Sequence, residues 1–573
     1  MNKIKVISLL VIIGVLAAGA AYALTNAQPA RAAGTVTYNI FATDGYIRQA
    51  DHGGPDSLSP TYIYGFVGGR DNVNLKTYDY TAQTAVDYDD PNVVGSANPA
   101  PVPSGGKLTD AELPLAGHAQ FPAPAIYAVK NDVVEIRLKN LGVNANPLAP
   151  NDPHSIHLHG LDVDAANDGV PETSVGAVPA NLCNNGSSDT TAPYDCDGNG
   201  GSAPGAGNVI VYMFTALTPG TTMYHCHQEA DIHVQMGMYG ALVIYDTNDP
   251  AGDANSTLCS GGLMGGVQCG KGPGSGVGGI YNGYRYDKDV IMLLSELDSD
   301  YHWSEEGTYA AKQTLGLTND GTKPWNPVDY SPEYWYINGL SFPNTIGVNN
   351  AGINMTNWLQ VHPEYDPLIK GSISKASWAA SQYGITNPGE KVLLRMINMG
   401  FETQPMHIHG YHLKVLGNDQ RPWTWANKVT WGKPTAFDQG LEKNTILIGS
   451  GETYELLLDM GQQSSQSTYA DTSMSRFYDG SPACKASLDT LSIAYPSTNT
   501  PVTNKATGCP AIPDAGDPTN IGTHEYIGGP TVTGAVGLGG SVQLFPFHNH
   551  DDYKATNNGA YPGGMFTMVV PLP

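Results

Sequence analysis

The stretch YHCHQEADIHVQMGM, residues 224–238, places one cysteine, three histidines and two methionines within fifteen positions. The whole 573-residue chain contains only 7 Cys, 16 His and 15 Met. Thiolate, imidazole and thioether groups are the ligands that hold soft and borderline metal ions in proteins. The stretch therefore predicts a metal-binding segment.

Three further histidine clusters lie on either side of this stretch: HSIHLHG at 154–160, QPMHIHGYH at 404–412 and FPFHNHDD at 545–552. Each of the four clusters contains a His-x-His pair. In an extended strand, residues two positions apart point to the same face, so each pair directs two imidazoles toward one space. A single pair is weak evidence, because surface and core histidines also form such pairs, but four pairs together predict shared metal sites.

The sequence before the first and third clusters is repeated. AVKNDVVEIRLKNLG at 128–142 and NPGEKVLLRMINMG at 387–400 both read as a turn followed by a strand that ends in Asn. With Gly 68 and Pro 41 between runs of β-branched and aromatic residues, the chain is expected to be mostly β. The sequence thus predicts two similar β halves, each carrying two histidine pairs.

The four motifs, with His-Cys-His among them, resemble the copper-binding motifs of the multicopper oxidases. The resemblance implies an all-β fold of tandem cupredoxin-like Greek-key β-barrels or sandwiches. It also implies the two-domain, laccase-like type with the type 1 copper in the first cupredoxin domain. Head-to-tail homotrimers of such chains place the trinuclear copper sites at subunit interfaces.

The resemblance also implies four coppers per chain, one of type 1, one of type 2 and two of type 3. Soft thiolate and thioether ligands suit a type 1 copper, and Met236 is an alternative to Met238 as its axial ligand. The implied type 1 ligands are His154, Cys226, His233 and Met238; those of type 2 are His157 and His407; those of the type 3 pair are His159, His225, His227, His409, His548 and His550.

The second half differs at two of these positions. Gln404 stands where His154 stands in the first half, and Asn549 replaces Cys226. Neither side chain can substitute for a thiolate or an imidazole at a type 1 copper. The second half is therefore predicted to lack this copper.

Two acidic residues match positions at which the family carries acids that supply protons. Asp168 follows the first His-x-His, and Glu229 follows His-Cys-His. The alternatives are a turn aspartate before Gly169 and a solvated glutamate.

The predicted domain organisation begins with a signal peptide at 1–33, in which two lysines precede an apolar run and small residues. An uncleaved membrane anchor is the alternative. Cupredoxin domain 1 is expected at 34–250, a Gly-rich linker at 251–284 and cupredoxin domain 2, with insertions, at 285–573. A degenerate third domain within that last region is a second alternative.

Export to the periplasm or the extracellular space would put the cysteines in an oxidising compartment. Six of them form locally spaced pairs, 183 with 196, 259 with 269 and 484 with 509, although fifteen pairings of six cysteines are possible. Cys226 is left over. The net charge of -25 disfavours nucleic acid as a partner.

The function implied by the resemblance is a multicopper oxidase. It would couple one-electron oxidation of a reductant, either a phenol-like molecule or a metal ion such as Mn(II), Fe(II) or Cu(I), to four-electron reduction of O2 to water. The alternatives are a copper-containing nitrite reductase and a non-catalytic copper-binding or storage protein. Nitrite reduction needs only one catalytic copper, which would leave part of the histidine set without a role.

Overall fold

A computed structural model describes residues 34–49, 60–71, 73–88, 101–184, 194–196, 208–259, 269–305, 330–347, 349, 352–372, 377–381, 389–423, 441–463, 545–560 and 563–572. The predicted signal peptide and the predicted Cys484–Cys509 pair lie outside these residues. Within them, no helix is both long and apolar enough to cross a membrane.

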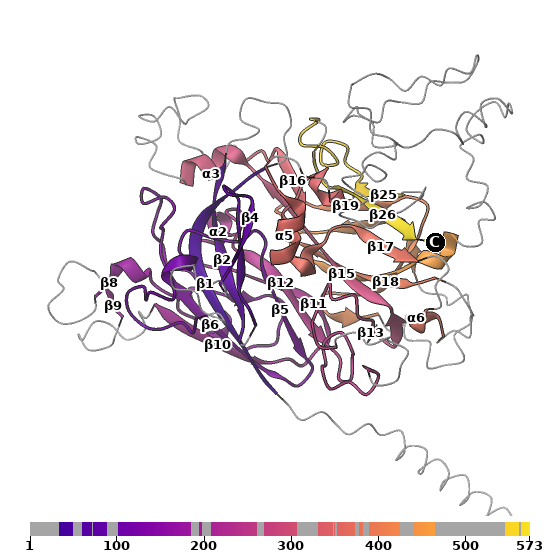
Figure 1. The fold of residues 1–573 in the computed structure, drawn as a ribbon, viewed down its shortest axis with the longest axis horizontal. Helices are drawn as coiled ribbons and strands as arrows, with labels where there is room; N and C mark the ends of the chain where they lie inside the picture. Colours follow the sequence, from indigo (N-terminus) through magenta and orange to yellow (C-terminus); the bar gives the residue numbers. More distant parts are fainter. Residues whose placement is uncertain are drawn as a thin grey trace, which may run out of the picture. The chain divides into compact units, whose positions relative to one another are not determined.

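Two four-stranded sheets form the first β-sandwich, which carries the indigo to magenta strands of Figure 1. Their strand orders are β10-β6-β1-β2 and β5-β12-β11-β7. The strands are β1 (Thr35–Ile47), β2 (Thr61–Arg70), β5 (Ala123–Val129), β6 (Val133–Asn140), β7 (His157–Leu158), β10 (Val209–Thr215), β11 (Gly220–His225) and β12 (Tyr239–Tyr245).

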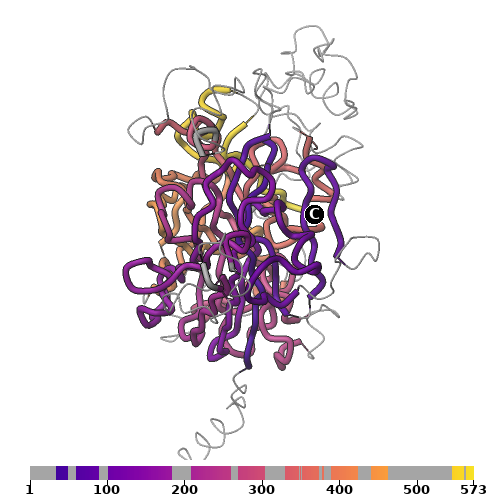
Figure 2. The backbone as a smooth tube through the Cα atoms, turned by 90° about the vertical axis from the view of Figure 1, so that its left-hand side faces the viewer, coloured from indigo at the N-terminus to yellow at the C-terminus, as the bar shows by residue number. Residues whose placement is uncertain are grey.

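The second sandwich pairs a sheet of order β16-β15-β18-β24-β20-β21, with β22 beside β20, with one of order β17-β26-β25-β19-β23. In Figure 2 its last strands, drawn in yellow, lie beside the salmon and orange ones. The strands are β15 (Lys288–Leu297), β16 (Tyr334–Ile337), β17 (Ile369–Ser372), β18 (Lys391–Asn398), β19 (Gln404–Ile408), β20 (Leu413–Asn418), β21 (Arg421–Pro422), β22 (Glu442–Lys443), β23 (Thr445–Ile448), β24 (Thr453–Asp459), β25 (Phe545–Asn549) and β26 (Phe566–Leu572).

Short elements complete the described part of the chain. The small strand pairs are β3 (Lys76–Asp79) with β4 (Thr84–Asp87), β8 (Cys183–Asn184) with β9 (Tyr194–Asp195), and β13 (Gly279–Tyr281) with β14 (Tyr284–Tyr286). The helices are α2 (Ala230–His233), α3 (Ser299–Glu305), α5 (Met355–Val361) and α6 (Trp378–Ser381), with 3-10 turns η1 (Leu113–Leu115), η2 (Ala165–Asn167), η3 (Ala180–Leu182), η6 (Asn344–Ile346), η7 (Pro363–Tyr365) and η9 (Met460–Gln463).

The two repeated segments occupy the same place in the two sandwiches. β6 pairs in parallel with β1 and antiparallel with β10. β18 likewise pairs in parallel with β15 and antiparallel with β24. The predicted all-β fold of tandem cupredoxin-like sandwiches is therefore confirmed.

Burial follows the strand period. In β6, Val134, Ile136 and Leu138 are fully buried, whereas the residues between them are partly exposed. Strands with one face on the core and one toward solvent show this alternation. β18 has no exposed face, because its other side lies against the first sandwich through contacts with β11.

Buried polar contacts join the two sandwiches around Arg395 of β18. Its Nε lies 2.7 Å from Asp289 Oδ2, and its Nη1 donates to Thr221 Oγ1 of the first sandwich at 3.2 Å. Its guanidinium also lies over the ring of Tyr245, whose hydroxyl donates to Asp289. One buried ion pair thus holds residues of both sandwiches.

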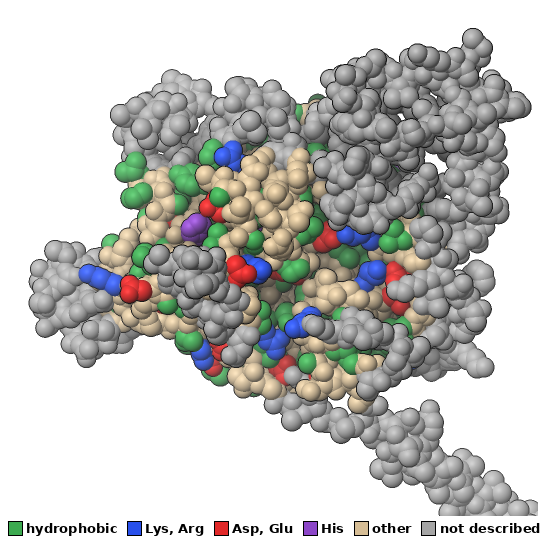
Figure 3. Space-filling view, viewed as in Figure 1, with side chains coloured by type: hydrophobic (Ala, Val, Ile, Leu, Met, Phe, Trp, Pro, Cys, Tyr) green, Lys and Arg blue, Asp and Glu red, His purple; other side chains and the backbone are tan. Residues whose placement is uncertain are grey.

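The disulfides Cys183–Cys196 and Cys259–Cys269 are formed as predicted, and Cys226 is a free, buried thiol. On the face shown in Figure 3, basic side chains lie among acidic ones, so the described part of that face has no patch of one sign. The domain boundaries remain a prediction, and β13 falls within the segment expected to be a linker.

Replacing Arg395 with Met should lower the free energy of unfolding by about 3–5 kcal/mol, because it leaves Asp289 buried without its cation. Lys76→Met is the matched control, since the Lys76–Asp87 pair is partly exposed and its loss should cost less than about 1 kcal/mol. Urea unfolding of both variants measures the difference. Equal destabilisation by the two substitutions would contradict the role given to Arg395.

Candidate metal centres

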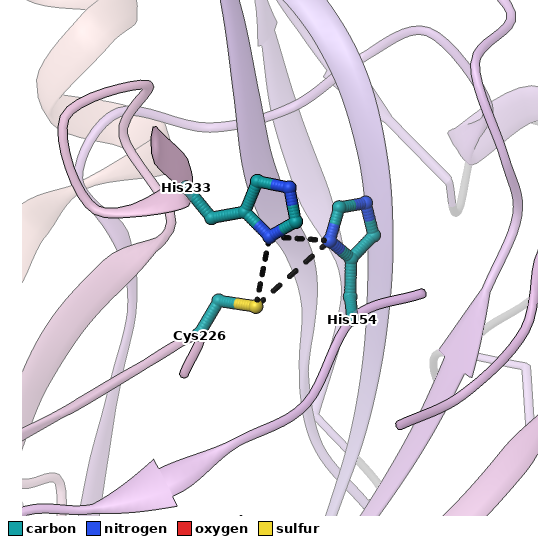
Figure 4. A group of neighbouring side chains, drawn as sticks. All are labelled: His154, Cys226 and His233. Atoms are coloured by element: carbon teal, nitrogen blue, oxygen red, sulfur yellow. Dashed lines mark hydrogen bonds between the residues drawn. The ribbon is translucent and has the colours of Figure 1, made fainter. Parts of the chain in front are cut away.

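Three of the predicted ligands meet in the interior of the first sandwich (Figure 4). The Nδ1 atom of His233 lies 3.3 Å from Cys226 Sγ and 3.3 Å from Nδ1 of His154, while His154 Nδ1 lies 3.9 Å from the sulfur. All three side chains are buried. We call these residues the His–Cys–His group.

The segments that carry the group are tied together by backbone hydrogen bonds. The Cys226 amide donates to the Met238 carbonyl at 3.0 Å, and the Met238 amide donates to the His233 carbonyl at 3.0 Å. The Ser155 amide points at the sulfur from 3.4 Å. Met238 and Met236 are both buried, so the choice of axial ligand remains a prediction.

Burial and neighbouring charge act in opposite directions on the two imidazoles. Burial, together with His233, holds the pKa of His154 well below its usual range. Burial also acts to lower the pKa of His233, but Cys226 and Asp152 outweigh it and raise that pKa to about 10. Two imidazole nitrogens aimed at one thiol sulfur form the donor set that suits copper.

Four histidines of the first sandwich form a second cluster, the first quartet: His157, His159, His225 and His227. Their ring centroids lie 5.0 to 5.9 Å apart in the pairs that touch. The Nδ1 atoms of His157 and His225 face the backbone carbonyls of Asp168 at 2.7 Å and Cys226 at 2.8 Å. Their Nε2 atoms are therefore the nitrogens left for a metal.

The second sandwich repeats this arrangement in the second quartet: His407, His409, His548 and His550. His548 Nδ1 faces the Asn549 carbonyl at 2.7 Å, as His225 faces that of Cys226. His407 Nδ1 lies 2.8 Å from Thr445 Oγ1. The Nε2 atoms of His409 and His548 are 3.0 Å apart.

No ring contact joins the two quartets within one chain, although all eight histidines lie in the described part of the structure. Within that part, no three ring nitrogens of a quartet lie within 4.8 Å of one another, whereas the two nitrogens and the sulfur of the His–Cys–His group do. Apart from His225, the quartet side chains are exposed or half-buried.

The two predicted acids lie in different places. Asp168 Oδ1 is 3.2 Å from His157 Nδ1, which puts this carboxylate beside the first quartet. Glu229 lies with Asp152 and His233, on the side of the His–Cys–His group. The chain bends at Glu229, whose φ of 44° is left-handed and ends the extended run from His225.

In the second sandwich, an amide pair occupies the place of the His–Cys–His group. Asn549 Nδ2 donates to Gln404 Oε1 at 2.6 Å, and the Asn549 amide donates to the Met565 carbonyl as Cys226 does to Met238. The Met565 amide donates to the Lys554 carbonyl, so Lys554 takes the place of His233. None of Gln404, Asn549 and Lys554 offers a thiolate or an imidazole.

A buried carboxylate completes this pair. Glu296 accepts from Gln404 Nε2 at 3.1 Å and from Tyr330 at 3.2 Å. Burial raises the pKa of Glu296 to about 7. Tyr330 also donates to Gln235 of the first sandwich, two residues from His233.

Residues 102–248 and 360–464 match the family model described as multicopper oxidase. The chain therefore carries a multicopper oxidase domain over these residues. Copper is the cofactor that such a domain implies, and the donors of the His–Cys–His group fit it. The predicted resemblance to the multicopper oxidases is thereby confirmed, and the domain is that of an oxidoreductase.

Curated relatives of this chain include copper resistance protein A of Escherichia coli, 22% identical over 64% of this chain and 44% of the relative. The protein of that name from Pseudomonas syringae pv. tomato is 20% identical over 60% and 42%. The chain thus spans less than half the length of these relatives. Similar solved structures include the blue copper oxidase from Nitrosomonas europaea, with a TM-score of 0.41 and 16% identity over 93% of this chain and 84% of that one.

Several residues of these sites escape sequence reasoning. Asp152 beside His233, Thr445 beside His407 and Glu296 beside Gln404 reach their partners only through the fold. Asp152 alone carries a spacing signal, because it precedes His154 by two positions. The sequence positions of Lys554 and Glu296 give no indication that these residues lie beside the amide pair.

Asn549→Ala should lower the free energy of unfolding by about 1–3 kcal/mol, because the buried oxygen of Gln404 loses its donor. Asn444→Ala, at an exposed position, serves as the control and should change that free energy by less than about 0.5 kcal/mol. Denaturant unfolding of the copper-free variants separates the two. Unchanged stability in Asn549→Ala would show that the amide pair contributes nothing.

Proposed function

We propose that this protein is a multicopper oxidase that couples the one-electron oxidation of a reductant to the four-electron reduction of O2 to water. The observation that carries the proposal is the position of Cys226. Its sulfur belongs to the His–Cys–His group, while His225 and His227 on either side belong to the first quartet. One peptide unit therefore joins the group that would accept electrons to the group that would pass them to O2.

Four coppers per chain account for the donor set. When bound, copper in the His–Cys–His group supplies a one-electron acceptor, and copper held by the histidine quartets supplies the site of O2 reduction. The type 1 copper is assigned to His154, Cys226, His233 and Met238, the type 2 copper to His157 and His407, and the type 3 pair to His159, His225, His227, His409, His548 and His550.

The residues around the copper positions have roles of their own. The Cys226 carbonyl accepts from His225 Nδ1, which adds a hydrogen-bonded connection beside the peptide unit. The backbone carbonyl of Asp168 fixes the ring of His157. The side-chain carboxylate of Asp168 is available to carry protons toward the first quartet. Such contacts orient metal ligands and set their basicity.

We further propose that the quartets of neighbouring chains combine in a homotrimer. Each quartet opens to the surface, and neither alone brings three ligand atoms as close together as the His–Cys–His group does. Two exposed apolar side chains lie near the quartets: Leu447 is on β23, which pairs with β19, and Met213 is on β10, where its amide donates to Asn167, the residue before Asp168. A head-to-tail ring would bury both and bring eight imidazoles together.

The domain boundaries and the location of the protein are part of the same proposal. Residues 1–33 would export the chain to the periplasm or the extracellular space. The two disulfides among the described residues support this, because disulfides persist in oxidising compartments. Residues 34–250 and 285–573 would form the two copper domains, joined by 251–284.

A nitrite reductase and a copper-storage protein are the rival functions. A nitrite reductase with one catalytic copper would need neither His227 nor the full second quartet. A storage protein would not need Cys226 to connect two groups. Oxygen uptake by the copper-loaded protein, recorded with a phenol and with Mn(II), separates these functions.

Cys226→Ser should remove the intense blue absorption of the copper-loaded protein, because serine lacks the soft thiolate that produces it. Oxygen uptake should fall to background, while the coppers of the quartets are retained. Cys183→Ser is the control that also removes one sulfur, yet its blue colour should remain. A blue Cys226→Ser protein would disprove the assignment of the type 1 copper.

His157→Ala and His407→Ala should each be inactive, but their mixture should recover part of the oxygen uptake after co-refolding. A trimer that contains both variants has subunit interfaces at which both quartets are intact. Sedimentation should show that copper stabilises the trimer, because binding favours the assembled state. No recovery, together with a copper-loaded monomer, would place the trinuclear site inside one chain.

A further inference from the structure

A buried glutamine connects the proposed type 1 ligands to the second half of the chain. The segment from His233 to Met238 carries two of these ligands, and we call it the ligand loop. Within the loop, the side chain of Gln235 is buried. Its Nε2 atom donates to the Glu296 carbonyl of β15 at 3.4 Å, and its Oε1 atom accepts from the Tyr330 hydroxyl at 3.2 Å. Both ends of this amide group are therefore held from outside the first sandwich.

The carboxylate of Glu296 fixes the hydroxyl that reaches Gln235. Four donors surround its two oxygens: the backbone amides of Phe401 and Glu402, the side-chain amide of Gln404 and the hydroxyl of Tyr330. A buried carboxylate with this many hydrogen bonds is held in one orientation. The ring of Tyr330 also packs on Phe401, with 5.5 Å between the centroids. The Tyr330 hydroxyl is thus fixed where it meets the ligand loop.

The helix α3 holds the backbone of the same loop. The ring of His302 lies with Nδ1 2.5 Å from the Tyr62 carbonyl of β2 and with Nε2 3.1 Å from the Gln235 carbonyl. The Tyr301 hydroxyl donates to the Asp231 carbonyl at 3.3 Å, two residues before the loop begins. In Figure 1, α3 lies beside the strands of the first sandwich, and it contacts β2. Side-chain and backbone contacts therefore converge on Gln235.

We propose that Gln235 is a positioning residue, through which Glu296 and Tyr330 hold the ligand loop in the geometry that the type 1 copper requires. This inference rests on the proposed function, in which the loop supplies an imidazole and a thioether to that copper. Removing a partner that orients metal ligands typically changes metal affinity or activity by about 10- to 100-fold. The polar groups around Glu296 therefore act on the copper site of the first sandwich.

A purely structural role for these contacts is the competing explanation. The chain provides a matched example, because the Tyr336 hydroxyl of β16 donates to Gln49 Oε1 at 2.8 Å. This bond also joins a tyrosine of the second half to a buried glutamine of the first, but it lies outside the ligand loop. A comparison of the two tyrosine–glutamine bonds isolates the effect on the copper site.

Hydrogen exchange in the copper-free protein tests the hold on the loop without any metal. Tyr330→Phe removes one hydroxyl and keeps the ring. The backbone amides of Met236 and Met238, which are hydrogen-bonded in the wild-type protein, should then exchange about fivefold faster. Tyr336→Phe should leave both rates within about twofold, because its bond lies elsewhere. Equal acceleration by the two substitutions would overturn the inference.

The copper-loaded protein gives a readout that a structural contact would not change. Tyr330→Phe should shift the blue absorption band and lower the reduction potential, because a loosened loop lets the ligands relax toward the geometry that Cu(II) prefers. A tenfold loss of preference for Cu(I) corresponds to a fall of about 59 mV. Tyr336→Phe should change neither the band nor the potential.

A second variant tests the same contact from the other side. Gln235→Leu removes the amide group but keeps the backbone carbonyl that faces His302. It should reproduce the shifts of Tyr330→Phe, and the double variant should shift no further than Gln235→Leu alone, because both substitutions remove one contact. Wild-type band and potential in both single variants would overturn the inference.

The wild-type protein separates this inference from the proposed function. A blue protein that takes up no oxygen with any reductant would reject the oxidase, while the band and the potential would still report on the ligand loop. A colourless copper-loaded protein would reject the type 1 copper. Hydrogen exchange in the copper-free protein would then still decide whether Tyr330 holds the loop.

Discussion

The pleat of an extended chain at His225, Cys226 and His227 is the constraint on which both proposed metal centres depend. Neighbouring side chains of a strand point to opposite faces. The sulfur of Cys226 therefore enters the sandwich interior, where His154 and His233 meet it, while the flanking imidazoles reach the surface cluster. A one-residue shift in the register of β11 would turn Cys226 toward the surface and the flanking histidines toward the interior. Neither set of metal donors would then form.

The second sandwich keeps the same backbone framework but has no counterpart of the His–Cys–His group among its described residues. Asn549 and Met565 repeat the backbone hydrogen bond of Cys226 and Met238, and His548 repeats the contact of His225. In place of metal ligands the interior holds the Asn549–Gln404 amide pair, which Glu296 completes. Buried polar groups need partners, and these amide and carboxyl groups satisfy one another.

Much of this arrangement follows from the sequence alone. The repeated strands β6 and β18, the histidine pairs and the replacement of Cys226 by Asn549 follow from spacing and strand period. Glu229 shows where such reasoning stops. Two residues after His227 it would share that face in a continued strand, but its left-handed backbone turns the chain into α2 and brings it beside His233. Asp152 joins it through a contact between segments far apart in sequence, which no local pattern encodes.

The central claim is that one chain holds a complete His–Cys–His copper site and two halves of trinuclear sites that only neighbouring chains complete. Anomalous scattering at the copper absorption edge, measured on crystals of the copper-loaded protein, locates every copper directly. The account predicts one copper beside Cys226 in each chain and three coppers between the first quartet of one chain and the second quartet of the next. Three coppers enclosed by a single chain, or a copper beside Asn549, would contradict it.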